Sequence, residues 1–431
     1  MLFSNQIEKV ATKYAEHSMR NALKKNFKLE VLASEFKKIP QAGREYMLYI
    51  HVPFCHTFCP YCSFHKYQYD EDRARAYFAS LKQELLMLKE AGYDFKTLYI
   101  GGGTTLINEG ELEKTLRYIK DEFSVTQVSA ETDPSHIKPE QLQRFKGLID
   151  RLSVGVQSFN DETLKRVARY DKFGSASVIR QRIEQALGIF PELSVDLIFN
   201  LPKQSADELR HDIEVVKQSG AQQVTFYPLM RSNITTKAIE RSLGAKMKDN
   251  EREYYDIICE QMSGYERTNA WAFALRPSKL KDEYVGAGVD FIGAGSGAFS
   301  FSEGALLVNA FDLEEYTRRV SERKSTVLAR CEFAPRDRVR YRFVTALFDG
   351  AIDVDKFNAH NACNLLSYMA KELSMLRLAG AVSIRAGRVE PTHFGRYLSL
   401  VMMREFYSGM DRVRAAFRDK KVPEIGLQKI F

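Results

Sequence analysis

YIHVPFCHTFCPYCSF, residues 49–64, holds three of the six cysteines in this chain of 431 residues. Cys55, Cys59 and Cys62 stand close together, directly after the apolar run Tyr46–Val52, which predicts a buried strand. The other three cysteines are scattered along the chain, which is not the pattern of a disulfide framework. In a reducing compartment, clustered thiols are more often metal ligands than disulfide partners. The segment therefore predicts a metal-binding loop that follows a strand.

Two kinds of metal centre fit this loop. Three thiolates can hold three irons of a [4Fe–4S] cluster and leave the fourth iron without a protein ligand. S-adenosylmethionine (SAM) has an amine and a carboxylate suited to that open iron, and a reduced cluster can break its C–S bond to release a carbon radical. The alternative is a structural Cys3His zinc site with His51, His56 or His65 as the fourth ligand. Zinc sites usually combine two short ligand pairs, and because no second pair is present, the spacing favours iron–sulfur and leaves zinc open.

The composition is that of a packed protein, with 45% hydrophobic and 28% charged residues. No apolar run approaches the roughly 18 residues that a membrane span needs, and the N-terminus lacks the apolar core of a signal peptide. We expect a cytoplasmic protein without a membrane anchor. The net charge of +7 is a mild excess for this length, so it does not indicate nucleic-acid binding by itself, and it also suits a small anionic substrate.

A repeated strand-then-helix rhythm extends from about residue 46 to 230. The predicted strands are Tyr46–Val52, Lys96–Ile100, Gln127–Glu131, Arg151–Gln157, Leu193–Phe199 and Gln222–Tyr227. The predicted helices between them include Asp72–Ala91, Glu111–Glu122, Ala176–Ile189 and Ala206–Ser219. Six βα units with right-handed crossovers predict an α/β fold with a parallel sheet, built either as an open doubly wound sheet or as a partial barrel.

Beyond Pro228 the rhythm changes. A glycine-rich run from Gly286 to Phe301 predicts added strands and loops, in which the glycines form either a backbone platform beside a ligand or bulges and tight turns. The pattern is mostly helical from about Cys331. A helix, a second helix ending at Gly380 and short apolar runs after it would make a small winged-helix-like unit, for which DNA binding has no other support. We expect an N-terminal helical extension at residues 1–45, a core with added strands at 46–328 and a C-terminal domain at 329–431.

Polar residues recur where the predicted strands end. Gly101–Thr104 follows the second strand, where glycines let the backbone approach a ligand and offer N–H groups to an anionic end, or simply form a tight turn. The others are Glu131, Asp133, Gln157, Asp196 and Tyr227. Because parallel strands end at one rim, these residues predict a polar cup there. A carboxylate in it would bind a ligand ammonium, and Arg169 would bind a carboxylate unless it is a solvated helix residue.

With Tyr61 inside the cysteine loop, the sequence resembles the radical SAM enzymes. The string YIHVPFC…CPYCSF resembles the branch typified by oxygen-independent coproporphyrinogen III oxidase, and the likeness extends over about residues 46–410. It implies a partial, TIM-like (β/α)6 barrel with a C-terminal domain. It further implies cluster ligation by Cys55, Cys59 and Cys62, with Tyr49 near the cofactors. The residues that it assigns to SAM binding are Tyr49, Tyr61, Gly102, Gly103, Thr104, Glu131, Gln157, Arg169 and Asp196.

The resemblance also implies a tetrapyrrole substrate, either coproporphyrinogen III or heme, one or two SAM molecules, and a low-potential electron donor such as flavodoxin or ferredoxin. Oxidase-like decarboxylation of propionates is the first expectation. Phe64 stands where the oxidase has a further cysteine, and residues 1–45 contain no counterpart of its N-terminal arm. MMREFYSGMDRVR, residues 402–414, is similar to the anaerobic heme-degrading methyltransferases, which methylate and open the ring. A heme chaperone of the same fold is the non-catalytic alternative.

Overall fold

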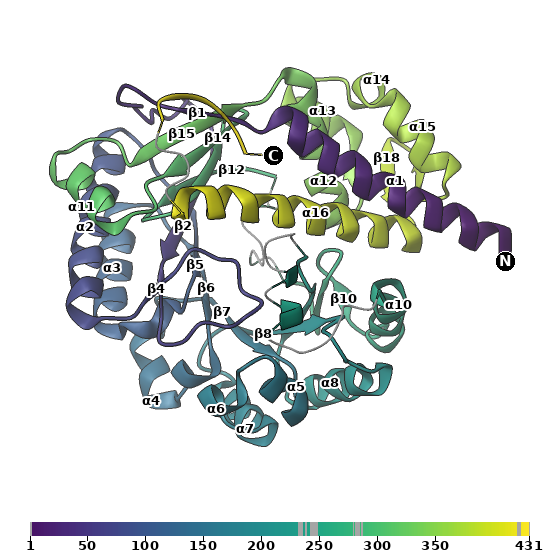
Figure 1. Ribbon diagram of the computed structural model, residues 1–431, viewed down its shortest axis with the longest axis horizontal. Coiled ribbons are helices and arrows are strands. Elements are labelled where there is room, and N and C mark those ends of the chain that lie inside the picture. The colour runs from purple at the N-terminus through teal and green to yellow at the C-terminus, as the bar shows by residue number, and fades with distance from the viewer. Residues whose placement is uncertain are drawn as a thin grey trace.

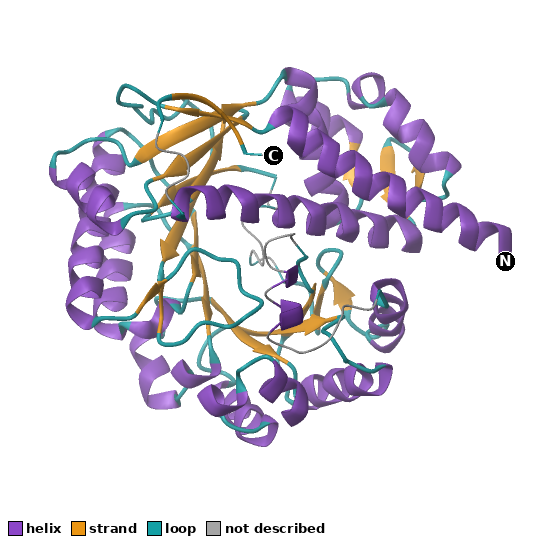
Figure 2. Ribbon diagram, viewed as in Figure 1, coloured by secondary structure: helices purple, strands orange, loops and turns teal. Residues whose placement is uncertain are grey.

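The computed structural model describes residues 2–231, 236–237, 239–241, 249–278, 280, 285, 288–419 and 424–430. Most of the strands in these parts belong to one curved sheet, with helices packed on its outer face (Figure 1, Figure 2). The order of strands in this sheet is β10-β11-β9-β8-β7-β6-β5-β2-β12-β13-β14-β15-β1-β19. Gly286, the first residue of the glycine-rich run, lies outside the described residues.

The parallel part of the sheet confirms the predicted βα units. Its strands are β2 (Tyr46–Val52), β5 (Thr97–Gly102), β6 (Gln127–Thr132), β7 (Arg151–Gln157), β8 (Glu192–Phe199) and β9 (Gln223–Pro228). The helices after these strands include α2 (Glu71–Glu90), α3 (Glu109–Glu122), α4 (Pro139–Leu142), α7 (Ala176–Ala186) and α8 (Ala206–Gln218). A doubly wound sheet reverses its strand order at a switch point. Here the order follows the sequence from β2 to β9, so the fold is a barrel segment.

The barrel segment is open because its two edges pair with other strands. On one side β9 pairs with the antiparallel β11 (Ala272–Ala274), and β11 in turn pairs with the edge strand β10 (Glu266–Arg267). On the other side β2 pairs with β12 (Asp290–Ala294), which leads to an antiparallel extension. The strands of that extension are β13 (Phe299–Ser302), β14 (Ala305–Asn309), β15 (Val327–Glu332), β1 (Lys28–Val31) and β19 (Gly426–Lys429).

The C-terminal unit has the winged-helix order of elements that the sequence predicts. It contains α12 (Pro335–Asp349), β16 (Ile352–Asp353), α13 (Val354–Asn361), α14 (Leu365–Tyr368), α15 (Ala370–Leu378), β17 (Val382–Arg385) and β18 (Arg388–Pro391). From this unit the long helix α16 (His393–Arg418) passes across the open side of the barrel, and α1 (Leu2–Asn26) lies beside it (Figure 1). Because β1 pairs with both β15 and β19, the sheet crosses the boundaries expected near residues 45 and 328, which stay a prediction.

A buried group of charges joins α1 and α16 to α10 (Glu251–Gln261). Arg404 on α16 forms ion pairs with Glu16 on α1, with Glu251 on α10 and, at 2.8 Å, with its neighbour Glu405. Glu405 also accepts from Arg20 of α1 at 2.6 Å. The side chain of Arg404 is 6% exposed and that of Glu251 is 1% exposed. Such charges are tolerated in a core only when they are paired, so this group fixes how the three helices meet.

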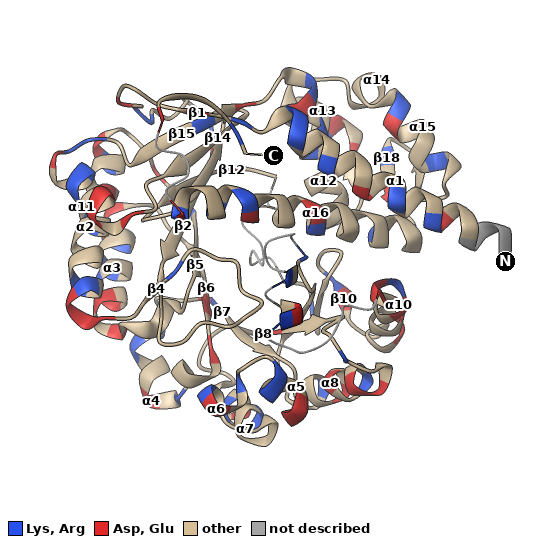
Figure 3. Cartoon of the chain, in the orientation of Figure 1, with Lys and Arg blue, Asp and Glu red and all other residues tan. Residues whose placement is uncertain are grey.

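Charged residues of both signs are spread over the part of the described chain that Figure 3 draws. Lys and Arg alternate with Asp and Glu along the outer helices (Figure 3), which agrees with the mild net charge. Among the described helices, none combines the length and the apolar character needed to cross a bilayer.

Candidate functional site

The cysteine loop begins where β2 ends, at the C-terminal rim of the barrel. The short strands β3 (Phe54–Cys55) and β4 (Tyr67–Gln68) pair with each other and close the base of the loop. The Tyr69 amide donates to the carbonyl of Cys55 at 3.0 Å and strengthens this closure. Cys55 is buried, whereas Cys59 and Cys62 are half-buried in the loop itself. The fold therefore presents three free thiols at the rim where barrel active sites lie.

The residues that follow β5 form hydrogen bonds with the backbone at the start of the cysteine loop. The Gly103 amide donates to the Val52 carbonyl and the Thr104 amide to the Phe54 carbonyl, each at 2.8 Å. These two N–H groups are therefore used within the protein, as in a tight turn, and the role of Gly102, Gly103 and Thr104 in SAM binding stays a prediction. The Thr104 hydroxyl lies 3.7 Å from the Cys55 sulfur and donates to Asp133 at 2.9 Å. Burial, followed by the neighbouring Cys62, raises the pKa of the Cys55 thiol to about 11.

Replacing Gly103 with alanine is expected to displace the cysteine loop. A Cβ atom at this position would lie 2.4 Å from the Phe54 carbonyl oxygen, a backbone atom that moves only if the loop moves. Overpacking of this kind costs about 1–3 kcal/mol. We expect less bound iron and sulfide after anaerobic reconstitution. Gly264→Ala is the control, since among the described residues no atom beyond its chain neighbours lies within 4 Å of its Cβ position, and equal iron content in both variants would refute the prediction.

The ends of the barrel strands form an accessible cup. The strands β5 to β9 are buried almost throughout, but each has half-exposed positions near its C-terminal end. These positions are Gly102 on β5, Glu131 on β6, Gly155 and Gln157 on β7, Asp196 and Ile198 on β8, and Tyr227 on β9. The structure thus brings Gly102, Glu131, Gln157 and Asp196, which the sequence predicts as site residues, to one rim.

Glu131 is the acidic side of the cup. The Tyr99 hydroxyl donates to its carboxylate at 2.7 Å, and Ser153 donates to the nearby Asp196 at 2.7 Å. Removal from water, together with the negative charge of Asp196, raises the pKa of Glu131 to about 7. Tyr49, also predicted as a site residue, lies beside Tyr99 with 6.4 Å between ring centroids. A positively charged ligand would stabilise the ionised form of this carboxyl group.

Arg169 is the basic side of the cup. Its side chain is buried, with the residue only 5% exposed, so a solvated helix position is excluded. The guanidinium donates to the Tyr61 hydroxyl at 3.0 Å, lies 3.3 Å from the Cys59 sulfur, and donates to the Gly155 carbonyl. Its Nε is buried without a hydrogen-bond partner among the described residues. Arg169 therefore links the cysteine loop to β7 and retains a donor for a ligand.

The histidines near the loop contact other groups, although Nδ1 of His65 is buried without a hydrogen-bond partner among the described residues. His51 contacts the Tyr49 hydroxyl through Nδ1 and the His65 carbonyl through Nε2, both at 2.9 Å. His65 contacts Ser296 at 3.1 Å, and the His56 ring packs against Tyr69. Among the described side chains, no three His, Cys, Asp or Glu groups converge as a single ion requires. Three thiolates that bind separate irons of a cube do not need to converge, so the loop suits a [4Fe–4S] cluster better than zinc.

Some contacts of the candidate site are absent from the sequence predictions. Tyr99 lies in a predicted strand and faces Glu131, but a tyrosine in a strand carries no signal of that role. Ser63 of the cysteine loop donates to Asp411 on α16 at 2.5 Å, across 348 residues of sequence. No local pattern predicts a contact between segments so distant in the chain.

The comparisons with known proteins agree with this site. Residues 49–216 match the Radical SAM superfamily model. The chain is 30% identical over 294 residues to the heme chaperone HemW of Bacillus subtilis (strain 168), covering 64% of this chain and 76% of that relative. It is 25% identical over 390 residues to the oxygen-independent coproporphyrinogen III oxidase of Escherichia coli (strain K12), covering 82% of this chain and 84% of the oxidase.

A further relative and a solved structure complete the comparison. The anaerobilin synthase of Escherichia coli O157:H7 is 23% identical over 337 residues, which is 74% of this chain and 75% of the synthase. The structure of coproporphyrinogen III oxidase (HemN) from Escherichia coli superimposes with a TM-score of 0.67 and 23% identity, over 84% of this chain and 90% of that one. The three-cysteine loop, the open barrel and these matches agree: the chain belongs to the radical SAM superfamily, in the group that contains the HemW and HemN proteins.

Proposed function

We propose that this protein is a [4Fe–4S]-dependent radical SAM enzyme that acts on a tetrapyrrole, with oxidase-like decarboxylation of propionates as the first candidate reaction. Membership in the superfamily implies a [4Fe–4S] cluster and SAM. The observation that carries the proposal is the half-exposed polar cup beside the three cysteines. A cup with a carboxylate and a guanidinium suits a ligand that has both an ammonium and a carboxylate.

Each residue of the cup has a task in this proposal. Cys55, Cys59 and Cys62 hold the cluster, and when bound and reduced, the cluster with SAM supplies a 5′-deoxyadenosyl radical. Glu131 would accept from the amine of SAM, and Arg169 would donate to the SAM carboxylate through its unpartnered Nε. Arg169 also keeps Cys59 and Tyr61 in place through the contacts described above. The barrel interior, lined by Tyr49 and Tyr99, shields the reacting atoms from water.

SAM binding is expected to weaken as the pH falls below 7. The Glu131 carboxyl has a pKa of about 7 in the free protein, and it must lose its proton before it can accept from an ammonium group. The apparent affinity should therefore be about tenfold lower at pH 6 than at pH 8. Calorimetric titration of SAM into the protein across this range measures the effect. Glu131→Gln should bind more weakly and with a smaller pH dependence, and a pH dependence as large as that of the wild-type protein would contradict the assignment.

The relatives support a tetrapyrrole substrate. The oxidase relative is named for coproporphyrinogen III, and 25% identity over most of both chains extends beyond the SAM-binding region. The anaerobilin synthase match favours a second reaction, methylation and opening of the heme ring, within the same radical chemistry. In this proposal both reactions use the cup to bind SAM, and they differ in substrate, in product and in whether one or two SAM molecules take part.

A heme chaperone is the second candidate function. The observation in its favour is the 30% identity to the Bacillus subtilis heme chaperone. A carrier would bind heme tightly and form no 5′-deoxyadenosine when a tetrapyrrole is added. The cup ranks the enzyme first, because a carrier has no need of paired groups for a SAM ammonium and carboxylate.

Product analysis tests these functions directly. Anaerobically reconstituted protein is reduced, with dithionite or with flavodoxin or ferredoxin as the proposed donor, and incubated with SAM and either coproporphyrinogen III or heme. Loss of carboxyl groups from coproporphyrinogen III, followed by mass spectrometry, supports the first candidate. A methylated, opened ring supports the second reaction. Heme binding without substrate-dependent 5′-deoxyadenosine would replace the enzyme with the chaperone.

A further inference from the structure

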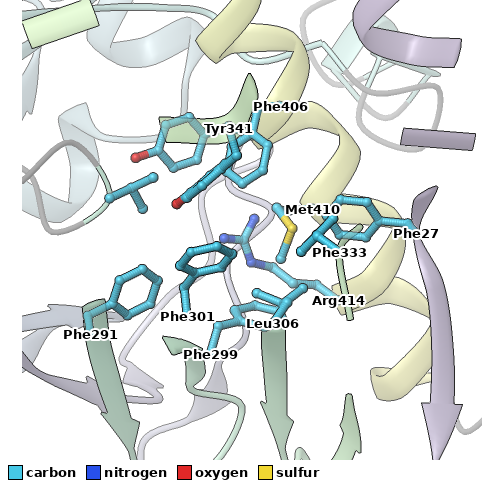
Figure 4. A pocket seen from close by; sticks show the side chains of 12 residues that line it. Phe27, Phe291, Phe299, Phe301, Leu306, Phe333, Tyr341, Phe406, Met410 and Arg414 are labelled. Atoms are coloured by element: carbon cyan, nitrogen blue, oxygen red, sulfur yellow. The ribbon is translucent and has the colours of Figure 1, made fainter. Parts of the chain in front are cut away.

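A small aromatic pocket lies between the antiparallel strands and α16 (Figure 4). Phe299 and Phe301 come from β13, Tyr341 from α12, and Phe406 and Met410 from α16. Its free volume of about 30 Å³ admits a group the size of a carboxyl and not a whole macrocycle. The pocket therefore suits one arm of a larger ligand.

The charged side chain in this pocket is Arg414. The residue is 5% exposed, and Figure 4 shows its guanidinium directed from α16 into the group of aromatic rings. It lies 4.9 Å from the Phe64 ring centroid and 5.7 Å from that of Phe299. In the described parts of the chain its ion-pair partner is Asp411, at 2.9 Å. A guanidinium has five N–H donors, so this pair leaves donors for another acceptor.

One wall of the pocket belongs to a buried cluster inside the barrel. Phe301 belongs to the same buried cluster as Met47, Tyr49 and Tyr99, whose side chains line the inside of the barrel. Phe64 and Ser63 belong to the cysteine loop, and Ser63 donates to the carboxylate that pairs with Arg414. The guanidinium thus lies where the barrel interior, the cysteine loop and α16 meet.

The positive charge of Arg414 also affects His51. Burial is the main cause of the low pKa of His51, about 4, and the positive charges of Arg414 and Lys66 lower it further. A guanidinium in an apolar, water-poor pocket binds a carboxylate strongly, because the donors are already desolvated and held in place.

We propose that Arg414 binds a carboxylate of the substrate, carried on a short apolar arm such as a tetrapyrrole propionate. The aromatic walls contact the methylene groups of the arm, and the free donors of the guanidinium bind its carboxylate. This inference rests on the proposed function and adds a residue that selects substrates with acidic side chains. Phe64 takes part by stacking on the guanidinium, a task that a cysteine at that position would not perform.

The alternative role for Arg414 is support of the cysteine loop through Asp411 and Ser63. The two roles differ in what they affect. A supporting residue changes cluster content and the binding of every ligand, whereas a carboxylate-binding residue changes only the affinity for ligands that carry the carboxylate.

The test is a titration of reconstituted full-length protein with coproporphyrin III and with its tetramethyl ester in the same detergent buffer, followed by absorbance. Wild-type protein should prefer the acid, and Arg414→Gln should weaken binding of the acid at least about 30-fold while leaving the ester unchanged. Arg414→Lys should retain part of the preference. Arg418→Gln is the control, because Arg418 lies on the same helix with a 42% exposed side chain.

Three results would overturn the inference. They are equal binding of acid and ester by wild-type protein, an equal loss for both ligands in Arg414→Gln, and a loss of iron and sulfide in both Arg414 variants, which would assign the residue to loop support. The proposed function fails separately, when wild-type protein forms no 5′-deoxyadenosine with any tetrapyrrole.

Discussion

Replacing Cys59 with serine is expected to remove the iron–sulfur chromophore and to reduce 5′-deoxyadenosine formation to background, a loss of about 10³-fold or more. Three thiolates are the protein ligands of the cluster, and serine leaves one iron without its sulfur ligand. Arg169, which lies 3.3 Å from the Cys59 sulfur, would keep its contacts with Tyr61 and Gly155, so the loop should stay folded. Iron and sulfide analysis with the absorbance spectrum measures the first effect, and chromatography of the nucleoside measures the second.

The matched control is Cys259→Ser. Cys259 is a half-buried thiol on α10 that accepts from Arg267 at 3.0 Å and has no part in the loop. This variant should retain the chromophore and the activity. Full iron content and turnover in Cys59→Ser would exclude the cluster assignment, and with it the proposed function.

Arg404→Ala is expected to destabilise the fold by about 3–5 kcal/mol. The substitution leaves Glu251, whose side chain is 1% exposed, without its cation, and leaves Glu405 with Arg20 as its remaining cation. Buried carboxylates without a partner must either take up protons or draw water into the core, and both outcomes oppose folding. Urea unfolding followed by circular dichroism measures the loss as a lower midpoint.

Arg318→Ala provides the comparison for this effect. Arg318 also pairs with two glutamates, Glu315 and Glu322, but its side chain is 50% exposed. Exposed pairs contribute up to about 1 kcal/mol, so the midpoint should hardly move. Similar midpoints for Arg404→Ala and the wild-type protein would show that the buried network does not hold α1, α10 and α16 together.

The barrel could be predicted because its signals are local. Each strand of the parallel sheet is a short apolar run followed by a helix, and strands β2 and β7 occupy the ranges that the sequence predicts. The cup could be predicted for a related reason, since parallel strands end on one side and Glu131, Gln157 and Asp196 stand at those ends. The hydrogen-bond partners of these residues were harder to predict. Tyr99, which donates to Glu131, has no sequence feature that distinguishes it from other tyrosines in strands.

Contacts between distant segments could not be predicted. The sequence shows the glycines around the end of β5. It does not show that the Gly103 amide donates to the Val52 carbonyl, because this contact depends on how two loops meet in space. The sequence predicts a helix at α16 and a family likeness at residues 402–414, but not that Asp411 and Arg414 contact the cysteine loop. In the same way, β1 and β19 are neighbours in the sheet although they lie at opposite ends of the described chain.

The pairing of α1 with α16 has a consequence for how the protein is made. Arg20 and Glu405 are 385 residues apart, so α1 leaves the ribosome long before its partner helix is synthesised. The barrel strands, which contact their neighbours in sequence, can assemble during translation, whereas contacts of such long range form late. We therefore expect the cysteine loop to stay open to delivery of iron and sulfide in the nascent chain until α16 arrives to cover it.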